Sequence, residues 1–172
     1  MRKILSKGLL AAYVLVLLWL VLFKFSFHIS AVFHHHHRSL NLVPFAAPSR
    51  IHGRINYMEM VYNCVFFIPF GLLLNVNFKK VGFFPKLAFM MVFSISVELI
   101  QYIFAIGATD ITDVITNTTG GFLGLIIYDL SKKIITQEKL DQIIITVGIV
   151  LLAIFLSIHG LHFIRVSQHG VQ

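Results

Sequence analysis

The sequence predicts an all-α integral membrane protein, a bundle of about five transmembrane helices, from its composition, its long apolar stretches and the placement of its basic residues. Hydrophobic residues make up 58% of the 172 residues and charged residues only 12%, whereas a soluble domain carries about 45–50% and about 25%. A soluble fold of this size could not bury so much apolar surface. A bilayer removes that constraint because it is itself an apolar solvent.

Five stretches come near the length of about 20 residues that a helix needs to cross a hydrocarbon core of about 30 Å. Lys7 and Lys24 lie near the ends of the first stretch, from where their long side chains can reach the headgroups. Pro85 lies in the first turn of the third stretch, where a missing N–H does no harm. We therefore expect a single membrane domain over residues 1–172, with helices at about 5–27, 57–78, 83–106, 110–128 and 142–164.

The basic residues predict the orientation of the bundle. Nine of the 14 Lys and Arg residues lie in the N-terminal tail and in the connections that follow the second and fourth stretches. Cytoplasmic loops are the ones enriched in Lys and Arg. We therefore expect the N-terminus inside, the C-terminus outside and residues 28–56 as an external loop.

Other features of the composition exclude functions rather than suggest them. The net charge of +7 could indicate a nucleic-acid partner, but the basic residues fall in short groups between apolar runs instead of along one polar face. No nucleic-acid partner is expected. The run His34–His37 lacks the spacing of metal ligands, so no metal is assigned to it and its role stays open.

Polar side chains on the third helix indicate a site within one leaflet. Glu98 and Gln101 are three residues apart and so share a helix face. Glu98 lies about 12 Å below the helix end at Ile106, at 1.5 Å per residue. A carboxylate at that depth costs about 2.5–3.5 kcal/mol on insertion scales, so it should point into the bundle and have a partner.

The fourth helix begins with further polar residues. Asp113 and Asn117 are four apart and share a face, with Asp110 one turn above. Helix capping would explain Asp110 without any function, but it does not explain Asn117, which lies two turns into the hydrocarbon. The connection 107–109 is so short that the third and fourth helices should be antiparallel neighbours. The acids of both helices should therefore converge in the outer leaflet.

Three carboxylates that close must raise one another's pKa, bind a cation or pair with a base. The bases on the same side of the membrane are Arg38, Arg50 and Arg54, and Asn63 on the second helix is placed to join the cluster.

A separate feature of the fourth helix is its small residues. The GxxxG spacing in this helix indicates close helix packing, with Gly120, Gly121 and Gly124 at the contact.

Four motifs follow one another along the chain: Asn41-Leu42-Val43-Pro44-Phe45; Asn63 with Ile68-Pro69-Phe70-Gly71; Glu98-x-x-Gln101; and Asp110-Ile111-Thr112-Asp113-Val114-Ile115-x-Asn117-Thr118-x-Gly120-Gly121. Together they resemble the VanZ-like family of bacterial membrane proteins over about residues 38–128. Thr112 stands where members often carry an Asp. The resemblance implies a multi-pass protein of the bacterial plasma membrane, linked to teicoplanin resistance or another cell-envelope function, without implying a reaction.

Three functions are compatible with these features. In the first, the outer-leaflet site alters how a lipoglycopeptide or a lipid-linked wall precursor sits in the bilayer. In the alternative, the protein is a membrane-embedded enzyme on a lipid-linked substrate, with Glu98 or Asp113 as general base or as ligands of a divalent cation that activates water. The third is a small transporter, because intramembrane acids also mark ion pathways. No other cofactor is expected, and the oligomeric state is left open.

Overall fold

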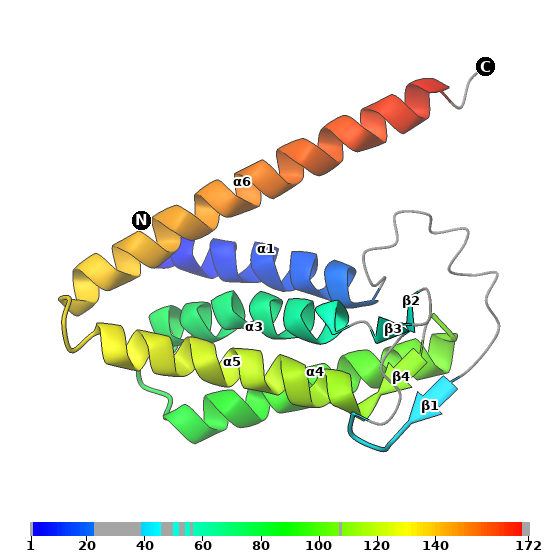
Figure 1. Cartoon of the computed structure of the whole chain (residues 1–172). Helices are drawn as coiled ribbons and strands as arrows, with labels where there is room; N and C mark the ends of the chain where they lie inside the picture. The colour runs from blue at the N-terminus through cyan, green and yellow to red at the C-terminus, as the bar shows by residue number, and fades with distance from the viewer. Residues whose placement is uncertain are drawn as a thin grey trace.

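The computed structural model describes residues 2–22, 39–45, 50–51, 54–55, 57–106 and 108–169. Over these ranges the chain forms five helices and four very short strands (Figure 1). The helices are α1 (Arg2–Leu22), α3 (Met58–Asn77), α4 (Phe83–Phe104), α5 (Ile111–Ser131) and α6 (Gln137–His169). The strands are β1 (Ser39–Asn41), β2 (Arg50–Ile51), β3 (Arg54–Ile55) and β4 (Ala108–Asp110).

The predicted fold class, an integral membrane helix bundle, is confirmed. Within the described ranges, four helices are long and apolar enough to cross a membrane: α1, α3, α4 and residues 137–158 of α6. The fifth, α5, has the length of a spanning helix but is not among the four. Its first turns carry Thr112, Asp113, Thr116 and Asn117, which lower its hydropathy. The bundle can accept these polar residues because all four are buried in the protein.

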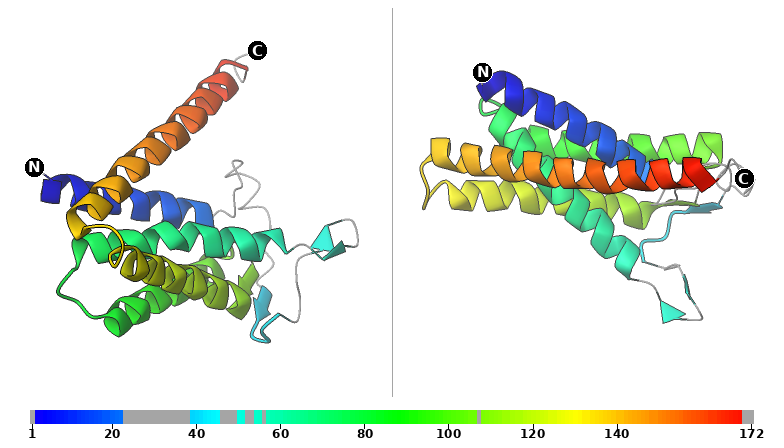
Figure 2. Two further views of the ribbon diagram at one scale, coloured as in Figure 1. Left: turned by 60° about the vertical axis from the view of Figure 1, so that its left-hand side comes forward. Right: turned by 90° about the horizontal axis from the view of Figure 1, so that it is seen from above.

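The helices α1, α3, α4 and α5 lie side by side, whereas α6 contacts α1 and α3 near its own beginning and then diverges from them (Figures 1 and 2). The most extensive helix contact is between α5 and α3, and α5 also packs on α4. The expectation that the third and fourth predicted helices are neighbours agrees with the α4–α5 contact. The position of α5 places its polar first turns between two apolar helices.

Glycines bring α5 close to α3. A Cβ atom added at Gly120 would overlap the carbonyl of Cys64, and one added at Gly124 would overlap the carbonyl of Ile68. Gly121 instead faces the Met90 side chain on α4. The two glycines of the GxxxG spacing therefore lie against α3, and the glycine beside them lies against α4.

The interior is apolar along the middle of the helices. Leu17, Phe67, Met90 and Leu125, which come from α1, α3, α4 and α5 respectively, belong to one buried cluster. The outward faces are apolar as well: Phe84, Val92 and Leu99 on α4 and Val150 and Ile154 on α6 are among the exposed large hydrophobic side chains. A bundle that is apolar inside and outside fits a bilayer, where lipid tails cover the outward faces.

Two element boundaries differ from those expected. α6 begins at Gln137 instead of residue 142, because Leu140 and Asp141 are buried against the rest of the bundle and extend the helix towards α5. Part of the expected external loop, residues 28–56, forms strands: β1 pairs in parallel with β4, and β2 pairs antiparallel with β3. The end of the first expected helix, residues 23–27, and the histidine run His34–His37 lie outside the described residues.

Candidate functional site

The α4–α5 junction carries a short strand that positions the start of α5. Strand β4 ends at Asp110, whose extended backbone makes it the N-cap of α5. Its Oδ1 accepts a hydrogen bond from the Thr112 backbone N–H at 2.7 Å. The cap satisfies a donor that a helix start leaves without an intrahelical partner. The capping role considered for Asp110 in the sequence is therefore present in the structure.

Strand β1 brings a distant segment of the chain to this junction. It pairs in parallel with β4, and Asn41 is the register partner of Asp110. The Asn41 side chain donates from Nδ2 to Asp110 Oδ2 at 3.1 Å. Beyond the strand, the Phe45 backbone N–H donates to Thr112 Oγ1 at 3.1 Å. Residues 39–45 are therefore fastened to the beginning of α5 at two points.

Glu98 on α4 is held against β4. Its Oε2 accepts the backbone N–H of Asp110 at 3.0 Å, and its backbone carbonyl accepts the Thr109 hydroxyl at 3.2 Å. The Glu98 residue is only 4% exposed. The expectation that this carboxylate points into the bundle and finds a partner there agrees with its position. The group that donates to Glu98 Oε2 is a backbone amide of the junction, which no pattern of side chains in the sequence indicates.

Asp113 and Asn117 connect α5 to the helices on either side. Asn63 Nδ2 on α3 donates to Asp113 Oδ1 at 2.8 Å, so the structure brings Asn63 to the acids. Asn117 Nδ2 donates to the Ser94 hydroxyl on α4 at 2.9 Å. Asp113 is 4% exposed and Asn117 is fully buried. We call Asn63, Glu98, Asp110, Asp113 and Asn117 the polar cluster.

The hydrogen bonds of the Gln101 amide nitrogen go to α1 and not to the acids. Gln101 is fully buried, and its Nε2 donates to the carbonyl oxygens of Val21 and Leu22, at 3.0 and 3.4 Å. It therefore closes the last turn of α1, where carbonyl groups lack intrahelical donors. Two buried acceptors in this region have no hydrogen-bond partner among the described residues: Gln101 Oε1 and Asn117 Oδ1.

The bases expected beside the acids can be placed only in part. Arg50 and Arg54 begin the paired strands β2 and β3, but their side chains lie outside what the structure describes, and so does the whole of Arg38. Within the described ranges, no group of three or more His, Cys, Asp or Glu side chains could hold a metal ion. Both the arginine pairing and the cation alternative therefore stay predictions.

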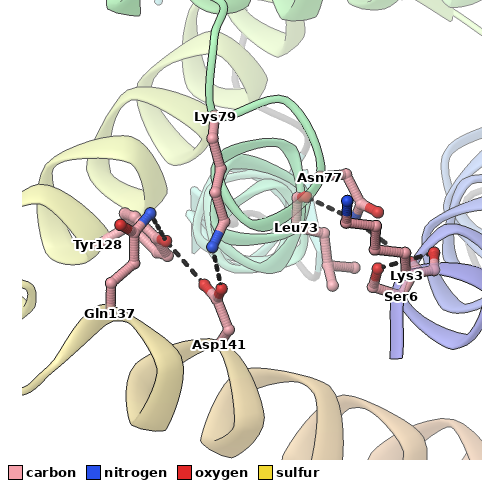
Figure 3. A network of polar contacts seen from close by, with 8 residues as sticks. All are labelled: Lys3, Ser6, Leu73, Asn77, Lys79, Tyr128, Gln137 and Asp141. Atoms are coloured by element: carbon pink, nitrogen blue, oxygen red, sulfur yellow. Dashed lines mark hydrogen bonds and ion pairs between the residues drawn. The ribbon is translucent and has the colours of Figure 1, made fainter. Parts of the chain in front are cut away.

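A second polar network, not expected from the sequence, lies near the opposite ends of the same helices (Figure 3). Lys79 forms an ion pair with Asp141 of α6, and Asp141 Oδ1 accepts the Tyr128 hydroxyl at 2.7 Å. Gln137 Nε2 donates to the same hydroxyl oxygen at 3.2 Å. This network fastens the beginning of α6 to the end of α5 and to the connection after α3. Its members lie between Lys79 and Asp141 in the chain, so no local sequence motif predicts the network.

The chemistry open to the polar cluster follows from its burial and its partners. Glu98 and Asp113 are almost inaccessible and each accept a hydrogen bond from the protein. One turn after Asp113 on α5, the Asn117 amide oxygen has no hydrogen-bond partner among the described residues. Such a site is preorganised, and the half-buried Asp110 offers carboxylate oxygens to a ligand that carries N–H or O–H donors. The structure brings Glu98, Asp110, Asp113, Asn117 and Asn63 together, and it places Gln101 at the neighbouring end of α1.

Comparisons with known proteins identify the family of the chain. A family model described as VanZ/LLP1 matches residues 10–132, which include the later part of α1, the strands and the whole polar cluster. The chain is 61% identical over 156 residues to Protein VanZ from Enterococcus faecium, an alignment that covers 91% of this chain and 93% of that protein. No solved structure gives a significant match. The resemblance indicated by the four motifs is confirmed, and the chain belongs to the VanZ/LLP1 family.

Proposed function

We propose that the protein protects the cell envelope from teicoplanin-type glycopeptides in the bacterial plasma membrane, with its polar cluster in the outer leaflet. The cluster binds the polar part of a lipid-anchored molecule, either the drug or a lipid-linked wall precursor. The distribution of basic residues supports this orientation. Family membership supports the link to the envelope.

The observation that carries the proposal is that residues 39–45 are hydrogen-bonded to Asp110 and Thr112 at the beginning of α5. Asn41 and the Phe45 backbone bind the start of α5, yet Leu42, Val43 and Phe45 remain exposed. The exposed apolar segment next to the half-buried Asp110 presents two unlike surfaces to one ligand. A molecule with an apolar anchor and a donor-rich head matches both surfaces.

The test is drug susceptibility in a susceptible bacterium that expresses the chain. We expect the wild-type protein to raise the minimal inhibitory concentration of teicoplanin, and to raise that of a glycopeptide without an acyl chain much less. Glu98→Gln and Asp113→Asn should lower the protection, because each replaces an acceptor-only carboxylate with a group that also donates. Glu138→Gln is the matched control, since Glu138 is exposed on α6 away from the cluster.

Immunoblots of the membrane fraction must show equal protein levels for all variants. Full protection by Glu98→Gln and Asp113→Asn at normal levels would contradict the role of the cluster. The enzymatic alternative makes a different prediction for the purified protein. It predicts a new product, detected by mass spectrometry, when a lipid-linked precursor is added, and none with Glu98→Gln.

A further inference from the structure

A cavity of about 440 Å³ lies between α1, α3 and α6, and none of the residues of the polar cluster lines it. Figures 1 and 2 show that α6 diverges from the two other helices. The lining of the cavity consists of Leu, Val, Ile, Phe, Pro and Gly residues together with one tyrosine, Tyr13. All three helices are among those apolar enough to span a membrane. The cavity therefore belongs to the hydrocarbon layer.

The wall of this cavity offers no free hydrogen-bond donor. The Tyr13 hydroxyl already donates to the carbonyl oxygen of Phe66, at 2.6 Å. An occupant with hydrogen-bond acceptors would lose its hydrogen bonds to water and find no donor here, which costs several kcal/mol in hydrocarbon surroundings. The occupant that suits such a wall is a neutral hydrocarbon.

The length of the cavity suits a single hydrocarbon chain. On α1 the lining runs from Leu9 to Leu20, which is about 16 Å at 1.5 Å per residue. On α6 it runs from Ile143 to Phe155, which is about 18 Å. One leaflet of the hydrocarbon core is about 15 Å thick, half of about 30 Å. The cavity is therefore about as long as one acyl chain of one leaflet.

The residues of the wall argue against a second helix as the occupant. Helices that pair within a membrane do so through small residues, which let the backbones approach, as Gly120 and Gly124 do between α5 and α3. The one glycine in the wall, Gly148, already faces Leu9: an added Cβ would lie 2.9 Å from Leu9 Cδ2. The remaining wall is bulky and branched, and a thin, flexible chain can follow it where a helix cannot.

We propose that this cavity binds one acyl chain of a bilayer phospholipid, and we refer to it as the acyl groove. The proposal does not depend on glycopeptide protection or on the polar cluster. Its site is formed by α1, α3 and α6, and its ligand is a constituent of the membrane itself.

Native mass spectrometry of the full-length protein, extracted from membranes in a mild detergent, tests the proposal. We expect the wild-type protein to carry one phospholipid. Val147→Phe adds a ring inside the acyl groove and should weaken the affinity for the lipid about tenfold, which corresponds to about 1.4 kcal/mol and lowers the lipid-bound fraction. Val150→Phe is a matched control: Val147 and Val150 are 50% and 51% exposed on the same helix, but Val150 does not line the groove.

The single tryptophan locates the bound chain. Trp19 stacks edge-on against Phe155 of the groove wall, with ring centroids 6.1 Å apart. Vesicles of phosphatidylcholine with brominated acyl chains should quench Trp19 fluorescence in the wild-type protein and in Val150→Phe. Quenching should be weaker in Val147→Phe and in Val16→Phe, which fills the groove from the α1 side.

Three results would overturn the proposal. The first is an equal lipid-bound fraction in the wild-type protein, Val147→Phe and Val150→Phe. The second is a wild-type protein without bound lipid whose Trp19 quenching is unchanged by both groove-filling variants. The third is a wild-type dimer that Val147→Phe converts to a monomer in size-exclusion chromatography with light scattering, which would make a second copy the occupant. Circular dichroism of each variant confirms that loss of lipid is not loss of fold.

Discussion

Lys86 is a buried cation near the beginning of α4, and its environment explains how the bundle accommodates it. The residue is 6% exposed, and its Nζ donates to Asn75 Oδ1 on α3 at 2.6 Å. Asn75 Nδ2 in turn donates to the carbonyl oxygen of Leu125 on α5 at 3.2 Å. The amide therefore links the ammonium group of one helix to the backbone of another. Such a chain is stable only when each member has its partner.

We predict that Asn75→Leu destabilises the protein by about 3 kcal/mol, because it leaves a buried ammonium group without its acceptor. The double variant Asn75→Leu with Lys86→Met should recover most of that loss, since it removes the buried charge as well. Unfolding of the purified protein in mixed micelles, followed by circular dichroism, measures both. If the two substitutions were additive, Lys86 and Asn75 would not be coupled.

At the scale of single residues, the sequence identified many residues of the polar cluster but few of their hydrogen-bond partners. Glu98 and Asp113 stood out because carboxylates are expensive in hydrocarbon, and Asn63 was a candidate partner because it lies near the same end of its helix. The donor to Glu98, the Asp110 N–H, depends on the extended backbone of β4. Gln101 shares a face with Glu98, but its amide reaches α1. Helix periodicity specifies a face and not the neighbour that the face meets.

At the scale of elements, the α3–α5 contact organises the bundle. Gly71 on α3 lies opposite Gly121 and Gly124 on α5, so the two backbones approach each other directly. Lipid tails are as apolar as the helices, so no hydrophobic effect drives the helices together. Close packing of α3 on α5 instead stabilises the contact through dispersion attraction. The contact also determines how far α5 is from α3 at the polar cluster, where Asn63 must reach Asp113.

We predict that Gly120→Ala destabilises the protein by about 1–3 kcal/mol, the usual cost of forcing an extra methyl group into a packed contact. Gly8→Ala on α1 is the control, because nothing lies within 4 Å of the added Cβ. That control should be neutral or stabilise by about 0.5–1 kcal/mol, since Gly is a poor helix residue. Thermal unfolding in detergent compares the two, and equal melting temperatures would show that the α3–α5 contact has room to adjust.

The pairing of β1 with β4 could not be predicted from local patterns. Each strand has three residues, too few for an alternation of polar and apolar side chains to stand out. The partners are also far apart in the chain, with Asn41 opposite Asp110. The helices, by contrast, were predictable because a spanning helix needs about 20 apolar residues, and so long a run is conspicuous.

At the scale of the whole molecule, the bundle has two polar ends of different character. One end holds the buried acids of the polar cluster. The other holds the ion pair between Lys79 and Asp141, with Lys132 and Asp129 paired nearby on the surface. Because cytoplasmic loops are enriched in Lys and Arg, the second end is the one expected inside the cell.

We predict that a membrane-impermeant thiol reagent labels Leu42→Cys in intact cells but labels Ile134→Cys only after permeabilisation. Both side chains are well exposed, 66% for Leu42 and 88% for Ile134, so accessibility within the protein does not limit the reaction. The native cysteine, Cys64, is replaced by Ala in both variants. Labelling of Ile134→Cys in intact cells, with Leu42→Cys protected, would reverse the orientation and place the polar cluster at the cytoplasmic face.

The sequence by itself determined that this is a membrane helix bundle, which helices it contains and which polar residues lie within them, because both hydropathy and helix periodicity are local properties of the chain. It also indicated the family, through motifs that end at Gly121. The tertiary structure decided which groups meet: the strand β1 on β4, Asn63 on Asp113, Gln101 on α1 and the divergence of α6 that forms the acyl groove. Those contacts join segments far apart in the chain, and they depend on helix packing that no single segment contains.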